Sequence, residues 1–121
     1  MTKQGEFSHI EFPADDLDRA KTFYSNVFGW QFRDAQGFEN YALYEAGPGE
    51  LGGGIGLRGQ TAPNQVRNYI SVDSVDDSVA TVTANGGSVV MPATDIGFGW
   101  YAAVTDTEGN EIGLYTPKPQ A

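Results

Sequence analysis

Polar and apolar residues alternate near the start of the chain. In residues 7–12, His9 and Glu11 fall on one face of an extended segment, and Ile10 and Phe12 fall on the other. Side chains point to opposite faces of a strand with a period of two, so this pattern predicts a half-buried strand. The apolar face is expected to lie under a helix, which leaves the polar face open to a ligand.

Helical spacing follows this predicted strand. Pro13 is expected to end the strand, and Asp15 or Asp16 can cap the N-terminus of the helix with its carboxylate. Gly29 is expected to end the helix in a left-handed conformation. The predicted apolar stripe, spaced by three and four residues and crossed by the stem of Lys21, consists of Leu17, Ala20, Tyr24, Val27 and Phe28.

Three short extended runs come next, at residues 30–32, 41–44 and 51–57. The links between them, residues 33–40 and 45–50, have lengths typical of hairpin connections. The first half of the chain is therefore predicted to be a strand, a helix and three further strands.

The second half repeats this order at an offset of 58 residues, which aligns Leu17 with Val75 and Gly29 with Gly87. Residues 60–65 are interpreted as the connector, and residues 106–110 as a turn. We expect one α+β domain over residues 1–121, made of two βαβββ modules at about 5–58 and 66–116 that form cupped mixed sheets. The second module is predicted to have strands at 68–72, 88–92, 100–105 and 112–116 and a helix at 75–84.

Several short motifs carry a family resemblance. His9 is followed by Asp16-Leu17, Phe23-Tyr24 and the run from Val27 to Trp30, and the segment Asp106 to Tyr115 closes the chain. This combination resembles the vicinal oxygen chelate superfamily, which includes glyoxalases, bleomycin resistance proteins and extradiol dioxygenases. The resemblance implies two modules around a ligand cleft, paired within the chain or across a homodimer.

The resemblance also implies four positions for metal ligands, of which only His9 carries a ligand. Arg67 stands 58 residues after His9, and Gly113 occupies the last-strand position where metal-binding members commonly have a glutamate. Aligning residues 55–57 with 112–114 makes Gly56 its counterpart. Because a metal site usually needs three protein ligands, we expect a metal-free small-molecule-binding protein.

An enzyme is the alternative. His9 could bind a divalent metal in a rearranged site with Glu11 or Glu111, which would suit a lyase, an isomerase or a dioxygenase-type enzyme. Without a metal, His9 could serve as an acid or base, with Glu11 holding its tautomer.

Ligand-binding residues are predicted on the polar strand faces. Arg67 and Tyr69 share a face and could clamp a carboxylate or a carbonyl, although a salt bridge from Arg67 is an equal alternative. Tyr44, Trp100 and Tyr101 are the other predicted ligand-binding residues. The wider aromatic set that could line a pocket adds Phe38, Tyr41 and Tyr115.

The glycine-rich run at residues 47–56 has no Gly-Lys-Ser/Thr ending and leads into no predicted helix, so a phosphate loop is excluded. Glycine there is expected to permit a bulge or the close approach of another backbone.

Composition narrows the class of partner. With 16 acidic and 7 basic residues the net charge is −9, which disfavours nucleic acid. There is no cysteine, so disulfides and thiolate chemistry are excluded. No apolar run is long enough to span a membrane and no signal peptide is evident, so a cytoplasmic location is expected.

Overall fold

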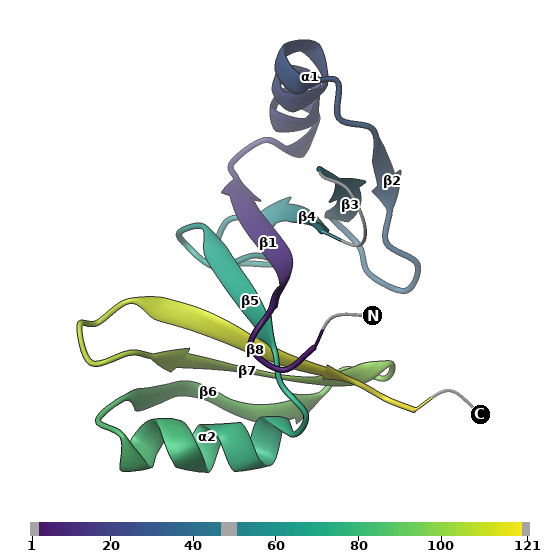
Figure 1. Cartoon of the computed structure of the whole chain (residues 1–121). Coiled ribbons are helices and arrows are strands. Elements are labelled where there is room, and N and C mark those ends of the chain that lie inside the picture. The colour runs from purple at the N-terminus through teal and green to yellow at the C-terminus, as the bar shows by residue number, and fades with distance from the viewer. Residues whose placement is uncertain (1–2, 47–50, 120–121) are drawn as a thin grey trace. The chain divides into compact units, whose positions relative to one another are not determined.

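The computed structural model describes residues 3–46 and 51–119, and the chain divides into two compact units. The first, here the α1 unit, is His9–Arg67. The second, here the α2 unit, is Met1–Ser8 together with Asn68–Ala121. Figure 1 labels the helices and strands of both units. The predicted α+β class is confirmed.

In its described residues, the α1 unit holds one helix and four strands. In chain order these are β1 (Phe7–Ala14, which begins in the other unit), α1 (Leu17–Phe28), β2 (Phe32–Asp34), β3 (Tyr41–Glu45) and β4 (Gly52–Leu57). The strands lie in the order β2-β3-β4-β1. β4 runs antiparallel to β3 and parallel to β1, so the sheet is mixed. Part of the predicted link at 45–50, residues 47–50, lies outside the described residues.

Helix α1 begins and ends where the sequence indicates. The side chain of Asp16 accepts a hydrogen bond from the Arg19 backbone N–H at 3.0 Å, so Asp16 is the N-cap. Gly29 ends the helix with φ of 78°. A left-handed residue costs glycine little, because glycine has no Cβ.

Two predicted boundaries in this unit are wrong. β1 continues through Pro13, which pairs with Gly56 of the parallel neighbour. Proline removes one hydrogen-bond donor, but an extended strand end tolerates its fixed φ. Trp30 precedes β2, and its ring stacks on that of Tyr44 with centroids 4.4 Å apart. The indole is thus used for packing under the helix, and the strand starts only at Phe32.

The α2 unit has the same element order as the α1 unit, which is a strand, a helix and three further strands. Its elements are β5 (Arg67–Ser71, whose first residue belongs to the other unit), α2 (Val75–Ala84), β6 (Ser88–Asp95), β7 (Gly99–Thr105) and β8 (Glu111–Pro117). The strands lie in the order β5-β8-β7-β6, with β5 parallel to β8. The predicted turn is confirmed, since the Asp106 N–H donates to the Asn110 carbonyl at 3.0 Å.

Each helix packs on one face of the strands in its own unit. Phe12 packs with Ala14 and Ile55 beneath α1, and Ile70 packs with Val72 beneath α2. The prediction that these apolar faces lie under the helices is therefore confirmed. Neither described helix has the length and apolar character needed to cross a membrane.

Candidate functional site

The polar face of β1 carries a three-residue chain of hydrogen bonds. The hydroxyl of Tyr41 on β3 lies 2.8 Å from Nε2 of His9 and donates to Oε2 of Glu11 at 2.5 Å. The imidazole and phenol rings are nearly parallel, at 12°. Tyr41 thus bridges the two residues that the sequence proposed as an acid–base pair. From the sequence alone, Tyr41 is predicted only as an aromatic residue that could line a pocket.

Burial sets the charge state of the histidine. The surrounding protein removes water from His9, which disfavours the imidazolium and lowers the pKa of His9 to about 4. At neutral pH the ring is therefore uncharged. Glu11 is also buried, with 7% of its surface exposed. A neutral imidazole, a phenol and a carboxyl group in hydrogen-bond contact can accept, donate and pass on protons.

The glycines of β4 make this arrangement possible. The Tyr41 side chain crosses β4 to reach β1, and a Cβ on Gly54 would overlap its ring, coming 2.5 Å from Cε2. On the opposite face, Tyr44 crosses β4 in the same way and donates to the Ile10 carbonyl at 2.7 Å. A Cβ on Gly53 would lie 2.7 Å from the Tyr44 hydroxyl and 2.7 Å from the Ile10 carbonyl carbon. The prediction that glycine here permits close backbone approach is confirmed.

The strand registers correct one alignment made from the sequence. Glu11 pairs with Gly54 in the α1 unit, and Tyr69, 58 residues later, pairs with Gly113 in the α2 unit. Gly54, and not Gly56, is therefore the counterpart of Gly113. The Ile-Gly-Leu triplet occurs in both last strands, so aligning the two triplets matched Gly56 with Gly113. Backbone pairing shifts this alignment by two residues.

A tyrosine ring covers each of these two glycines. Tyr41 lies over Gly54, and Tyr69 lies over Gly113, where a Cβ would come 2.5 Å from Cε2 of Tyr69. A carboxylate side chain at either position would have to displace a ring. The space that a glutamate ligand would need is filled by these rings.

The donor set in the described residues falls short of a divalent metal site. No three histidine, aspartate or glutamate side chains in residues 3–46 and 51–119 gather closely enough to hold an ion. A zinc or similar site usually needs three protein ligands.

Two predicted ligand residues lie on the helix side of their strands. Tyr44 is 3% exposed and packs beneath α1. Burial, and then the charges of Tyr24 and Glu11, raise the pKa of Tyr44 far above its usual range. Trp100 alternates with Ala102, which lies in the α2 core, and Lys118 Nζ lies 5.3 Å from its ring centroid. In β3 and β7 both alternating faces carry apolar or aromatic residues, so alternation there could not reveal which face the helix covers.

The other predicted ligand residues lie on the faces away from the helices. Tyr69 is buried over Gly113, and Tyr101 pairs with Tyr115 on the same face of the α2 unit. The Tyr101 hydroxyl contacts the Met91 sulfur at 2.6 Å. Arg67 is half-buried at the first position of β5 and shares a face with Tyr69 by alternation.

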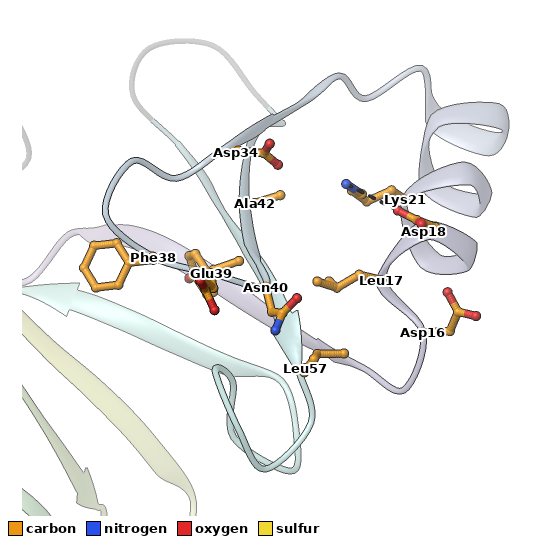
Figure 2. Close-up of a pocket in the computed structure, with 11 residues that line it drawn as sticks. Asp16, Leu17, Asp18, Lys21, Asp34, Phe38, Glu39, Asn40, Ala42 and Leu57 are labelled. Atoms are coloured by element: carbon orange, nitrogen blue, oxygen red, sulfur yellow. Dashed lines mark ion pairs between the residues drawn. The ribbon is translucent and has the colours of Figure 1, made fainter.

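A cavity of about 550 Å³ lies at the start of α1, between that helix and the β2–β3 loop (Figure 2). Leu17, Ala42 and Leu57 form its apolar wall, and Lys21 forms an ion pair with Asp18 at 3.8 Å. Leu17 and Ala42 belong to the helix-covered side of the sheet, and Tyr41, whose hydroxyl contacts His9, also lines the cavity. The remaining polar lining residues are mostly acidic: Asp16, Asp34, Glu39 and Asn40.

Comparison with known proteins identifies the family. The model of the Glyoxalase/Bleomycin resistance protein/Dioxygenase superfamily matches residues 6–114. The chain therefore belongs to this superfamily, as the motifs around His9 and Asp106 indicated.

Curated relatives agree with this assignment. The chain is 33% identical over 120 residues to the putative glyoxylase CFP32 of Mycobacterium tuberculosis, covering 93% of this chain and 46% of that protein. It is 32% identical over 124 residues to a glyoxylase-like domain-containing protein of Didymella fabae, covering 96% of this chain and 97% of that protein. The chain thus spans about half the length of the mycobacterial relative.

Solved structures share the fold at low identity. Methylmalonyl-CoA epimerase of Streptomyces coelicolor, in complex with 2-nitronate-propionyl-CoA, aligns with a TM-score of 0.74 and 18% identity over 97% of this chain and 100% of that one. A glyoxalase/bleomycin resistance protein/dioxygenase superfamily member from Vibrio splendidus aligns with a TM-score of 0.64 and 10% identity over 91% and 97%. At these identities the likeness concerns the fold.

Proposed function

We propose that the protein binds a small organic molecule at the sheet face that carries His9, and that it does so without a divalent metal. The observation that carries this proposal is the tyrosine ring over each glycine at the last-strand positions, Gly54 and Gly113. A ring in the space of a carboxylate ligand favours contact with an organic molecule over coordination of an ion. The hydrogen-bonding groups of His9, Tyr41 and Glu11 supply polar contacts on this face of the α1 unit.

Elemental analysis of the purified chain tests the metal-free part. We expect well below one divalent metal ion per chain, with no difference between wild type and His9→Ala. About one zinc, nickel, manganese or iron per chain in the wild type, lost in His9→Ala, would contradict the proposal.

A thermal-shift screen of small organic molecules tests the binding part, because a ligand that binds only the folded state raises the melting temperature. Compounds that stabilise the wild type are then measured with His9→Ala and with Tyr44→Phe. Tyr44→Phe is the matched control, since this hydroxyl lies on the helix-covered face. We expect His9→Ala to remove the shift and Tyr44→Phe to retain it. Retention in both variants would place the ligand elsewhere.

A second candidate function is acid–base catalysis, which the neutral state of His9 favours. A base that is unprotonated at neutral pH and linked to a carboxylate through Tyr41 can abstract a proton from a bound substrate. Structural neighbours include methylmalonyl-CoA epimerase, so methylmalonyl-CoA is a reasonable probe. The test is loss of the C2 proton signal in D₂O by NMR. Exchange that wild type accelerates and His9→Gln does not would support this function, and no acceleration by wild type would count against it for this probe.

The predicted homodimer and the clamp of Arg67 and Tyr69 on a carboxylate or carbonyl remain predictions. Light scattering at micromolar concentration measures the mass directly, and a monomer mass would remove the dimer. Arg67→Ala should weaken an anionic or carbonyl ligand found in the screen by about 1.5–3 kcal/mol, the range for a hydrogen bond to a charged group.

A further inference from the structure

His9 and Glu11 both lie within hydrogen-bond distance of the Tyr41 hydroxyl, which has one proton to donate. Its oxygen lies 2.8 Å from His9 Nε2 and 2.5 Å from Glu11 Oε2. If the hydroxyl donates its hydrogen bond to Glu11, the Tyr41 oxygen can only accept from His9, which requires a proton on Nε2. If the hydroxyl donates its hydrogen bond to His9, Nε2 must be unprotonated and Glu11 must carry a proton of its own. The two arrangements therefore correspond to opposite tautomers of the imidazole.

The distances favour donation to Glu11. A distance of 2.5 Å between hydroxyl and carboxyl oxygens is within the range of charge-assisted hydrogen bonds, which join a hydroxyl to an ionised carboxylate. The 2.8 Å contact to His9 is ordinary for a neutral pair. An ionised carboxylate that is buried, as Glu11 is, needs such a donor to offset its lost hydration.

We infer that Tyr41 is a positioning residue whose hydroxyl donates its hydrogen bond to ionised Glu11 and thereby holds neutral His9 in the tautomer protonated at Nε2. Nδ1 is then the unprotonated nitrogen. Toward a group bound at Nδ1, His9 acts as a hydrogen-bond acceptor or a base. The inference goes beyond the proposed function and does not depend on it, because the tautomer exists without ligand.

The fold supports this role through β4. The Tyr41 ring can lie between β3 and β1 only because Gly54 has no side chain beneath it. The ring is also held nearly parallel to the imidazole, with centroids 6.5 Å apart. The hydroxyl is thus fixed in position by backbone packing rather than by His9 alone.

The chain has a single histidine, so imidazole NMR of the uniformly ¹⁵N-labelled, untagged protein gives one unambiguous spin system. At pH 7 and without ligand we expect the pattern of a neutral ring with the proton on Nε2. A pattern with the proton on Nδ1, or a charged ring, would overturn the inference. This outcome is independent of whether the protein later proves to bind a small molecule.

Paired variants test whether Tyr41 is responsible. In Tyr41→Phe we expect the Nε2 proton to exchange with water about tenfold faster, the equivalent of one hydrogen bond. Tyr44→Phe removes a hydroxyl that crosses the same strand on the other face, and we expect it to leave the exchange unchanged. Equal exchange in wild type and Tyr41→Phe, or an equal increase in both variants, would overturn the role of Tyr41. If Tyr41→Phe does not fold, the wild-type tautomer still decides the inference.

Discussion

The ring of Tyr69 on β5 covers Gly113 on β8, so that a Cβ on residue 113 would lie 2.7 Å from Cγ of Tyr69 and nearer still to its ring edge. The two residues are direct partners in the parallel pairing of these strands. Glycine at this position is therefore required by packing. The same explanation applies to Gly54 under Tyr41.

Replacing Gly113 with alanine should destabilise the α2 unit. The added methyl overlaps the Tyr69 ring, and overpacking of this kind costs about 1–3 kcal/mol in the free energy of unfolding. Urea denaturation measures the loss. Because the cause is the ring, Gly113→Ala should cost much less in a Tyr69→Ala background. An equal cost in both backgrounds would mean that the ring is not responsible.

Gly53 and Gly54 should respond differently to the same substitution. A Cβ on Gly53 meets the backbone of Ile10, whereas the three atoms nearest to a Cβ on Gly54 all belong to the Tyr41 side chain. The loss of stability caused by Gly54→Ala should therefore be smaller in a Tyr41→Ala background. The loss caused by Gly53→Ala should be the same in a Tyr44→Ala background as in the wild type. Urea denaturation of the two double-mutant cycles checks this. Relief in both cycles would show that β1 can move away from β4.

Protonation of His9 should make stability depend on pH between about 4 and 6.5. The pKa of His9 is lowered to about 4 in the folded chain, while an unfolded histidine titrates near 6.5. In this window the unfolded state binds more protons, so the free energy of unfolding rises with pH. The full contribution, present above about pH 6.5 and lost as pH falls to about 4, is roughly 3 kcal/mol.

Chemical denaturation across this pH range, compared with His9→Gln, isolates the contribution of His9. The slope should be smaller in the variant. Asp95 and Asp106 also have lowered pKa values, from hydrogen bonds of Lys118 and Asn110 respectively, but their effects belong to lower pH, where carboxylates protonate. Identical slopes in wild type and variant would contradict burial of a neutral His9.

Substitutions of Asp16 and of its neighbour Asp15 allow two interactions at the start of α1 to be compared. Asp16 caps the helix, so Asp16→Ala should cost about 1 kcal/mol in the free energy of unfolding. Asp15 forms an exposed ion pair with Arg58 at 2.8 Å, and such pairs contribute about 0–1 kcal/mol. Thermal unfolding of the two variants should rank Asp16→Ala as the more damaging. The reverse order would mean that the ion pair matters more than the cap.

The sequence by itself determined the element order and the faces of the first strands. Alternation in residues 7–12 and helical spacing from Leu17 onward depend on periods that are local to the chain, so Phe12 could be assigned to the helix side and His9 to the other. Caps and turns at Asp16, Gly29 and Asp106 were readable for the same reason, since their hydrogen bonds join residues a few positions apart.

Only the tertiary structure decided which residues meet across strands. Tyr41 lies 32 positions from His9 and 30 from Glu11, and their contact depends on the pairing of β4 with both β1 and β3. The register that makes Gly54 the counterpart of Gly113 is likewise set by backbone pairing between distant segments, which the repeated Ile-Gly-Leu triplet obscured. The helix-side positions of Tyr44 and Trp100 follow from where α1 and α2 pack. Local periodicity identifies the covered face where one face is polar, as in β1, but where both faces are apolar or aromatic, as in β3 and β7, the packing of the helices decides which of them is covered.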